Sequence, residues 1–502
     1  MKRSYLHVAL ALLGLVSLVA GLALVGVFYV ARQPALALTT LVLLGLATWV
    51  YLSPRFYAWR YVVPGILAAL IFIVLPMAYT LVIGFTNYSS AHLLPFERAT
   101  TVLLGRSDAS GEGYAFKLYA DGKQHRLVFT ADDESQLGSE PFTLGKDAKL
   151  PVAPLAGEPA GTPLKIKEVI ALQPALKELV ATTPDGKELR MSSLRRFSVM
   201  RPAYLRNTDG TLTEASTGEK LTADHKQGYW VRANGEPVQP GFRVYIGLQN
   251  YVSIFTDHRF FEPFARVFGW TISFAAINTI LTFAIGILLA TAMNWDALRF
   301  RNVYRMMLFL PYAVPAFISI PVFRGLFNEN LGEINMVLDM FFGIRPGWFS
   351  DATLARSMVL IVNTWLGYPY MMILCMGLIK AIPAELYEAS ALAGAGPVMN
   401  FSRITLPLIA RPIAPLLIAS FAFNFNNLTL IALLTGGAPD YLDTQVPVGA
   451  TDLLASYTYR IAFQDSGQNY ALACAIASIV FLLVATLAVV NLRLFKVNQN
   501  PA

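Results

Sequence analysis

Long apolar runs without charges constrain this 502-residue chain more than any other feature. A run of about 20 apolar residues is long enough to cross the hydrocarbon core of a bilayer as a helix. Such runs predict a mainly α, polytopic membrane protein with about eight transmembrane helices. They occupy residues 6–31, 35–53, 62–87, 264–294, 304–327, 357–380, 412–434 and 469–492.

Basic residues in the short connections predict the orientation, because cytoplasmic loops are enriched in Lys and Arg. With the N-terminus inside, the cytoplasmic segments carry 12 of these residues and the opposite short segments carry five. We therefore expect both termini in the cytoplasm and residues 88–262 on the outer side. This bias explains the net charge of +7, so no nucleic-acid partner is expected.

Three regions follow from this layout: residues 1–87 with three N-terminal spans, 88–262 as an external domain, and 263–502 as a five-helix core. Turn signals divide the external region, since Asp-Gly and Asn-Gly suit tight hairpins. They predict an antiparallel, β-rich domain with a hairpin over 116–129 and a helix near 174–180. A passive cap and a docking arm are both compatible with this domain. The turn signals are Asp121-Gly122, Asp185-Gly186, Asp209-Gly210 and Asn234-Gly235.

A cytoplasmic loop between the sixth and seventh runs, at residues 383–407, carries helix start and stop signals. Pro383 suits a first helical turn, because it lacks only a donor that would be unpaired there. Glu385 and Glu388 follow near the positive end of the helix dipole. Gly394 then ends the helix, since glycine adopts left-handed conformations. The spacing predicts a short rigid helix, either an ordinary connector or a lever for a partner.

Polar residues recur at helical spacing in the sixth and seventh runs. Each stripe follows an i, i+3, i+4, i+7 pattern, extends about 10 Å along its helix and straddles the middle of its run. Amides donate and accept hydrogen bonds, so the chemistry suits a neutral polar ligand such as a sugar. Hydrogen bonding between the helices themselves is the alternative. The stripes are Asn363, Leu366, Gly367 and Tyr370, and Ser420, Phe423, Asn424 and Asn427.

Several activities are disfavoured by residues that the sequence lacks. No G-x-x-x-x-G-K-[ST] motif occurs, so ATP is expected to be bound by another chain. The cores of the sixth and seventh runs contain no Asp, Glu, Lys or Arg, which disfavours an ionic cargo and a proton or sodium relay. Cys375 and Cys474 lie in apolar runs, where packing is favoured over metal binding. We expect no catalytic residue, metal or cofactor on this chain.

The 383–407 loop resembles the EAA coupling loop of ABC-importer permeases. The matching residues are Glu388, Ala389, Ser390, Gly394, Ile404, Leu406 and Pro407. Residues 363–383, 419–427 and 451–463 resemble the MalF family of maltose/maltodextrin permease subunits, within the binding-protein-dependent transport permeases. The close resemblance covers roughly residues 240–495, and the layout of spans and external domain covers the whole chain.

This resemblance implies a pore-forming transport subunit of the bacterial inner membrane, not an enzyme. It implies that maltose or maltodextrins pass from a periplasmic binding protein to the cytoplasm by alternating access. The implied partners are a second, MalG-like permease, a MalK-like ATPase dimer that holds ATP and Mg²⁺, and a periplasmic maltose-binding protein. All eight stripe residues are implied to contact the sugar. Glu388, Ala389, Ser390, Gly394, Leu406 and Pro407 are implied to couple to the ATPase.

Three other classes of protein remain as alternatives. The uncharged spans and the coupling loop disfavour a secondary sugar transporter. A sensory receptor fits the external domain, but no cytoplasmic output domain is visible. A membrane enzyme lacks a cluster of nucleophiles or metal ligands in its helices. Co-purification with a P-loop ATPase would separate the importer from all three.

Overall fold

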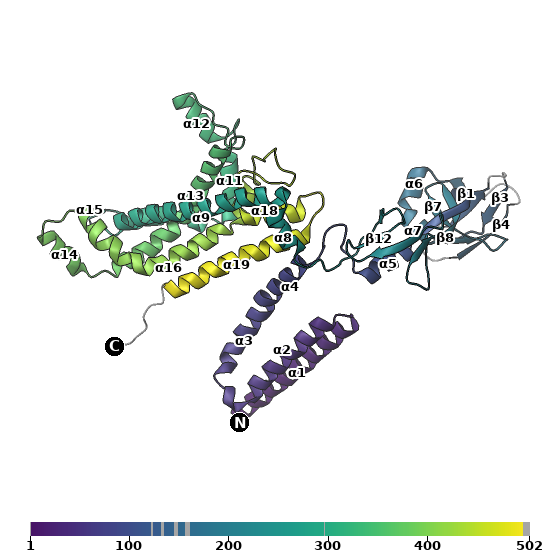
Figure 1. The fold of residues 1–502 in the computed structure, drawn as a ribbon, viewed down its shortest axis with the longest axis horizontal. Coiled ribbons are helices and arrows are strands. Elements are labelled where there is room, and N and C mark those ends of the chain that lie inside the picture. Colours follow the sequence, from purple (N-terminus) through teal and green to yellow (C-terminus); the bar gives the residue numbers. More distant parts are fainter. Residues whose placement is uncertain are drawn as a thin grey trace. The chain divides into compact units, whose positions relative to one another are not determined.

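The computed structural model describes residues 2–121, 124–131, 135–144, 149–155, 161–295 and 297–494. Its contacts divide the chain into a helical unit and a β-rich unit (Figure 1). The helical unit comprises Met1–Gly84, Tyr251–Arg460 and Leu472–Ala502, and the β-rich unit comprises Phe85–Asn250 and Ile461–Ala471.

Apolar helices of the helical unit account for the expected spans. Six described helices are long and apolar enough to cross a membrane, and a bent pair makes a seventh. A shorter apolar helix lies at Gly14–Val30, inside α1. The main helices are α1 (Lys2–Val30), α2 (Pro34–Leu52), α3 (Trp59–Ala69), α4 (Leu75–Gly84), α8 (Gln249–Thr256), α9 (His258–Met293), α10 (Arg301–Ala313), α11 (Ala316–Leu326), α12 (Glu333–Phe342), α13 (Ala352–Lys380), α14 (Ala384–Leu392), α15 (Pro397–Asn400), α16 (Leu406–Phe425), α17 (Leu428–Leu434), α18 (Leu454–Phe463) and α19 (Tyr470–Leu494). The fold class expected from the sequence is confirmed.

The apolar run at 304–327 forms a bent pair of helices. Helices α10 and α11 meet at 92°. The break falls at Val314, which has φ −93° and ψ 124°, and at Pro315 after it. A residue that precedes proline is disfavoured in the α conformation, so the helix stops there. Pro315 is one of three prolines in this run, so the sequence alone did not single out the position of the bend.

The apolar run at 412–434 is divided between α16 and α17. Helix α16 ends at Phe425, and Asn427 precedes α17. The Asn427 side-chain oxygen accepts a hydrogen bond from the Leu430 N–H at 3.2 Å, which makes it an N-cap. Asn426 therefore ends α16 and Asn427 starts α17, inside one continuous apolar run of the sequence.

The β-rich unit contains an eight-stranded sheet in the order β2-β3-β4-β6-β7-β8-β1-β5. An additional pairing of β2 with β1 closes the sheet on itself. All pairs are antiparallel except β4 with β6, as expected for a domain built from hairpins. The strands are β1 (Ser107–Asp121), β2 (Gln124–Thr130), β3 (Gln136–Ser139), β4 (Lys149–Pro154), β5 (Thr162–Pro163), β6 (Val180–Thr182), β7 (Glu188–Ser193) and β8 (Arg196–Pro202).

The expected hairpin is present, with Phe116 opposite Phe129 and Leu118 opposite Leu127. These four side chains are buried in the core that the closed sheet surrounds. Gly122, in the turn of this hairpin, lies outside the described residues. The expected helix near 174–180 is α7 (Gln173–Glu178), which follows α6 (Ile166–Ala171).

A second, five-stranded sheet in the order β13-β12-β11-β10-β9 packs on α5 (Phe96–Leu104). Trp230 is buried in its core and donates from Nε1 to Thr100 Oγ1 at 3.2 Å. Positive φ values at Gly186 (78°), Gly210 (82°) and Gly235 (83°) confirm three of the expected turns. The strands are β9 (Tyr204–Arg206), β10 (Leu212–Glu214), β11 (Lys220–Asp224), β12 (Tyr229–Val231) and β13 (Pro237–Val238).

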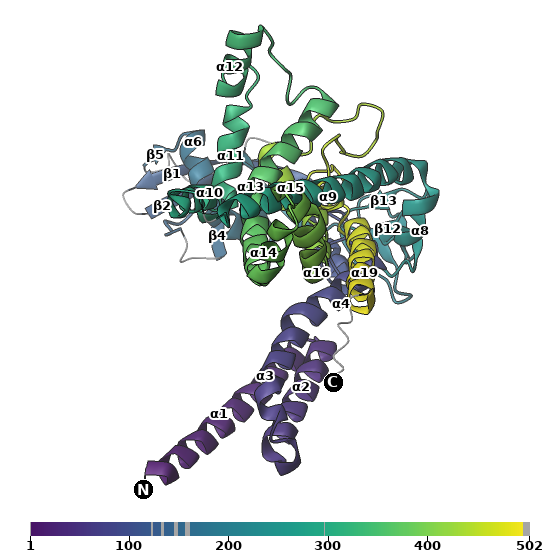
Figure 2. The same cartoon turned by 90° about the vertical axis from the view of Figure 1, so that its left-hand side faces the viewer.

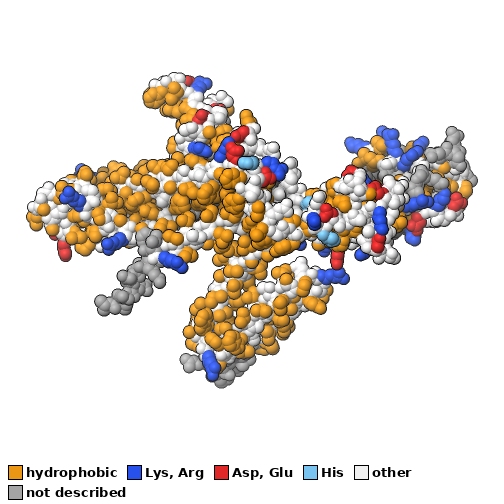
Figure 3. All heavy atoms as spheres, viewed as in Figure 1, with side chains coloured by type: hydrophobic (Ala, Val, Ile, Leu, Met, Phe, Trp, Pro, Cys, Tyr) orange, Lys and Arg blue, Asp and Glu red, His pale blue; other side chains and the backbone are white. Residues whose placement is uncertain are grey.

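The two units differ in surface chemistry (Figure 3). Helix surfaces are mostly apolar and carry their charges near the helix ends, whereas the β-rich unit displays both signs of charge. This contrast fits helices that meet lipid and a domain that meets water. Within the helical unit, α13 and α16 both pack against α9 (Figures 1 and 2).

Candidate functional site

The two polar stripes meet where α13, α16 and α17 pack against α9. Asn363 lies on α13, Asn424 on α16, and Asn427 at the start of α17. Thr279 on α9 completes the group. We call Thr279, Asn363, Asn424 and Asn427 the polar layer.

Hydrogen bonds link the polar layer into one chain of amides. Asn427 Nδ2 donates to Asn363 Oδ1 at 3.1 Å. Asn363 Nδ2 donates to Asn424 Oδ1 at 2.8 Å, and Asn424 Nδ2 donates to Thr279 Oγ1 at 3.4 Å. Asn363 and Asn424 are 6% and 5% exposed, so these bonds lie in the interior of the bundle. An amide has two donor hydrogens and two acceptor lone pairs, so each asparagine retains capacity for a ligand.

Two apolar clusters lie on either side of the polar layer along the helices. One contains Phe274 of α9, Val362 of α13 and Leu430 of α17. The other contains Ile287 of α9, Met372 of α13 and Ile413 of α16. On α9 and α13 the polar layer therefore falls between two apolar segments, and on α16 and α17 it lies at the break between the two helices. A polar layer at this depth is costly in lipid unless its groups are paired, which their hydrogen bonds achieve.

The aromatic members of the stripes are exposed in this chain. Tyr370 is 42% exposed and Phe423 is 73% exposed, whereas Ser420 is half-buried. The Tyr370 hydroxyl has no hydrogen-bond partner in the part of the chain that the structure describes. Both rings therefore present faces that another molecule can cover. Leu366 is half-buried and packs against the cluster that contains Val362 and Leu430.

Gly367 lies where α13 packs on α9. A Cβ built on Gly367 would lie 2.9 Å from Thr282 Cγ2, so the glycine lets α13 approach α9 closely. Small residues commonly allow such close approach between membrane helices.

Helix α9 contributes polar residues that the stripe pattern did not include. Besides Thr279, it places Asn278 in the interior with no side-chain hydrogen-bond partner among the described residues. Thr282 donates to the Asn278 carbonyl at 2.8 Å. Asn278, Thr279 and Thr282 interrupt an apolar run at i, i+1 and i+4. The same helical-spacing criterion applied to the fourth run would have found them.

The loop at residues 383–407 forms the short helix α14 with Pro383 as its N-cap residue. Pro383 was expected inside the first turn, and it precedes that turn by one position. Gly394 has φ 77°, so the helix ends in the left-handed conformation that glycine allows. Helix α15 follows, and a π-helical turn over Phe401–Thr405 leads directly into α16.

Two hydrogen bonds hold α14 against this second element. Tyr387 Oη and Thr405 Oγ1 are 2.9 Å apart, and Ser390 Oγ donates to Asn400 Oδ1 at 2.5 Å. The opposite surface of α14 is free, since Glu388 and Ala389 are exposed and Leu392 is 92% exposed. Helix α14 is thus fixed to the start of α16 and presents an outer surface. Of the remaining loop residues, Gly394 and Pro407 are exposed and Leu406 is half-buried.

A buried charge cluster orders the segment after α17. Arg460 Nη1 donates to Asp452 Oδ2 at 2.8 Å and to Asp440 Oδ1 at 2.9 Å. Asp452 also accepts from the Gly449 N–H at 2.8 Å and from Ser456 Oγ at 2.7 Å. Burial alone would lower the pKa of Arg460, but its bonds to Asp440 and Asp452 outweigh burial and raise it. No local pattern indicated this cluster, because its three members are spread over 20 residues.

Two further arginines fix the same segment to the long helices. Arg356 of α13 lies over the Trp270 ring at 4.6 Å and donates from Nε to the Ala450 carbonyl at 2.8 Å. Arg266 of α9 pairs with Asp443 at 2.9 Å. The segment between α17 and α18 is therefore held by α9 and α13, the helices that carry Thr279 and Asn363.

Comparisons with known proteins identify relatives along the chain. Residues 94–247 match the family described as maltose transport system permease protein MalF P2 domain. Residues 260–493 match the family described as binding-protein-dependent transport system inner membrane component.

Curated relatives named maltose/maltodextrin transport system permease protein MalF match nearly the whole chain. The relative from Escherichia coli (strain K12) is 48% identical over 492 residues, which cover 96% of this chain and 95% of the relative. The relative from Yersinia pestis is 48% identical over 95% of this chain and 92% of the relative. Among solved structures, a chain of a bacterial ABC transporter involved in the import of the acidic polysaccharide alginate matches at 20% identity. It covers 51% of this chain and 85% of that chain with a TM-score of 0.44.

Proposed function

Because this chain belongs to the MalF family of maltose/maltodextrin transport permeases, we propose that it carries maltose and maltodextrins across the bacterial inner membrane through the polar layer. The observation that carries this proposal is the neutral chain of amides between two apolar clusters. A sugar offers many hydroxyls and no charge, so amides that both donate and accept suit it.

The exposed aromatic rings extend the proposed sugar path. Tyr370 follows Asn363 by seven residues on α13, which is about 10 Å along the helix. Phe423 adjoins Asn424 on α16. Ring faces at these positions suit the C–H face of a pyranose, while the amides suit its hydroxyls. Ser420, Leu366 and Gly367 complete the proposed contact set. A second, MalG-like permease is proposed to cover the side on which Tyr370 and Phe423 are exposed.

The energy source is proposed to be a MalK-like ATPase dimer, which supplies the ATP and Mg²⁺ site. Its contact on this chain is the outer surface of α14, with Glu388 as the hydrogen-bonding residue. Ala389, Ser390, Gly394, Leu406 and Pro407 shape the rest of the coupling loop. Because α14 is bonded to the start of α16, a displacement of α14 moves the helix that carries Asn424.

The β-rich domain is proposed to face the periplasm and to contact the maltose-binding protein, with both termini in the cytoplasm. Transport then follows alternating access. ATP-driven closure of the motor favours a state in which the polar layer opens to the docked binding protein, and hydrolysis favours the inward-open state. The coupling is the difference in stability between these two states.

The test is ATP hydrolysis by the reconstituted complex, with and without maltose-loaded binding protein. We expect stimulation that Glu388→Lys abolishes. Glu385→Lys is the matched control, since Glu385 is an exposed acidic residue in the first turn of the same helix, and it should retain most of the stimulation. A chain that assembles with no ATPase would overturn the proposal and favour a secondary transporter.

A further inference from the structure

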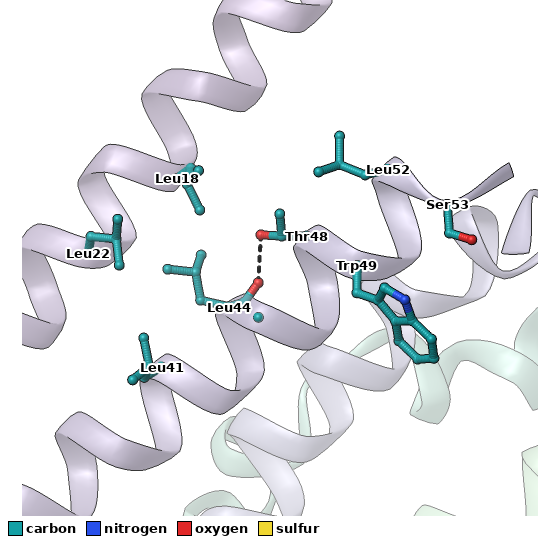
Figure 4. Close-up of a pocket in the computed structure, with 9 residues that line it drawn as sticks. Leu18, Leu22, Leu41, Leu44, Thr48, Trp49, Leu52 and Ser53 are labelled. Carbon is teal, nitrogen blue, oxygen red and sulfur yellow. Dashed lines mark hydrogen bonds between the residues drawn. The ribbon is translucent and has the colours of Figure 1, made fainter.

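The N-terminal helix pair carries an apolar groove (Figure 4). Helices α1 and α2 pack closely at Gly21, where an added Cβ would lie 2.8 Å from Leu44 Cδ1. Beside this contact the helices leave a groove of about 530 Å³. Leu18 and Leu22 extend from α1 toward Leu41 and Leu44 of α2 across it. Its volume is within the range of about 300–1,000 Å³ that is typical of small-molecule sites.

The groove wall offers a ligand almost no polar group. Thr48 donates its hydroxyl to the Leu44 carbonyl at 2.7 Å, so the hydroxyl is already used within α2 (Figure 4). Gly45 contributes bare backbone, and no atom lies within 4 Å of a Cβ built on it. The groove therefore suits a hydrocarbon chain.

The length of the groove matches one leaflet of a bilayer. From Leu41 to Ser53 it follows 12 residues of α2, or about 18 Å at 1.5 Å per residue. Half of a hydrocarbon core of about 30 Å is about 15 Å. The Ser53 end lies at the short connection that the charge bias places in the cytoplasm, so the groove lies in the cytoplasmic leaflet.

Two arginines lie at the Ser53 end of the groove. Arg60 donates from Nη2 to the Ser53 carbonyl at 3.3 Å, and its guanidinium lies 5.5 Å from the centre of the Tyr57 ring. Its Nε is buried with no hydrogen-bond partner among the residues that the structure describes. Arg55 is exposed in the same connection.

No acidic residue lies near Arg55 and Arg60 in the sequence. The first acidic residue of the sequence is Glu97, so residues 1–96 carry five basic and no acidic side chains. The N-terminal spans therefore cannot neutralise Arg55 and Arg60 from their own sequence. A basic cluster at the cytoplasmic end of membrane helices attracts anionic head groups.

We propose that this groove binds one anionic phospholipid of the cytoplasmic leaflet. One acyl chain lies along Leu18, Leu22, Leu41 and Gly45, and the phosphate lies against Arg55 and Arg60. The groove and the basic end thus form one site for a lipid that has both a hydrocarbon chain and a negative head group.

Native mass spectrometry of the full complex tests this site, with phosphatidylglycerol and phosphatidylcholine titrated as the two probes. We expect tight retention of phosphatidylglycerol by the wild type. Gly45→Leu fills the groove and should abolish that retention. The matched control is Gly26→Leu in α1, where a Cβ also has no atom within 4 Å. Both changes replace glycine with a better helix former, so neither weakens its helix.

The charge is tested separately from the groove. Arg55→Gln with Arg60→Gln should weaken phosphatidylglycerol binding about 25-fold, at roughly fivefold for each arginine. Arg32→Gln, at the opposite end of the helix pair, should leave it unchanged. Equal retention of phosphatidylcholine, or full retention by Gly45→Leu, would overturn the proposal. If the Gly45→Leu complex loses subunits and its lipid binding is unchanged, a helix of a partner subunit covers the groove. That result would also overturn the proposal.

Discussion

Asn424 is the residue at which a sugar contact and a structural bond between helices can be separated by experiment. Its side chain accepts from Asn363 at 2.8 Å and donates to Thr279 at 3.4 Å. Asn424→Leu removes both bonds and keeps a side chain of similar size. Thr279→Val removes only the second bond and is nearly isosteric.

The expected magnitudes differ for the two roles. An interhelical hydrogen bond in a membrane protein contributes about 0.6 kcal/mol on average, so the Leu variant loses roughly 1 kcal/mol of stability and the Val variant about half of that. If the amide also donates to and accepts from a sugar hydroxyl, two more bonds of about 0.5–1.5 kcal/mol each are lost. Since 1.4 kcal/mol corresponds to a factor of about ten, a loss of about 1–3 kcal/mol should lower transport roughly fivefold to a hundredfold in Asn424→Leu.

The assay is maltose uptake into proteoliposomes, read beside the Tm of the purified complex. We expect both variants to lower the Tm by a few degrees at most, and only Asn424→Leu to lower uptake by a factor of about five or more. Thr279→Val should retain more than a third of wild-type uptake. If uptake in both variants falls only in proportion to stability, the polar layer joins helices and does not bind sugar.

Three further predictions concern other parts of the chain. Arg460→Met should lower the free energy of unfolding by about 3–5 kcal/mol, because it leaves the buried carboxylate of Asp452 unpaired. Asp440→Asn should lower it by at most about 1 kcal/mol. Thermal unfolding of the complex measures both effects, and equal effects would contradict this account. Gly367→Leu should overpack the α9–α13 contact and cost about 1–3 kcal/mol in the same assay, whereas Gly269→Leu, which faces open space, should be neutral. Replacing residues 95–240 with a short Gly-Ser linker should reduce stimulation of ATP hydrolysis by the binding protein while the chain still inserts; failed insertion would assign the domain to folding instead.

Features that depend on local sequence were predictable. The apolar runs indicated where helices cross the membrane because a spanning helix must satisfy its own backbone. Asp-Gly and Asn-Gly turns indicated hairpins, and positive φ values at Gly186, Gly210 and Gly235 agree. Helical spacing predicted that the two stripes could meet at one depth, and Asn363 bonds to both Asn424 and Asn427. The stripe does not continue as one helix, however, because Asn427 lies beyond the end of α16.

Features that depend on contacts between distant residues were not predictable. The closure of the eight-stranded sheet requires β1 to pair with both β2 and β8, and no single segment encodes that. The packing role of Gly367 depends on Thr282, 85 residues earlier in the chain. Asp440, Asp452 and Arg460 form a cluster only because the segment after α17 folds back on itself. The bend at Pro315 had a local signal, but proline inside a membrane helix is often tolerated, so the signal alone was ambiguous.

Asn427 uses one amide for two purposes, and this links the polar layer to the start of α17. Its oxygen caps α17, and its nitrogen donates to Asn363. A hydroxyl that donates to the oxygen competes with the cap, which stabilises a helix start by about 1 kcal/mol. Helix α17 packs through Leu434 in the same cluster as Leu453, beside Asp452. Under the proposed function, a sugar hydroxyl bonded to the Asn427 oxygen would therefore change the stability of the segment between α17 and α18.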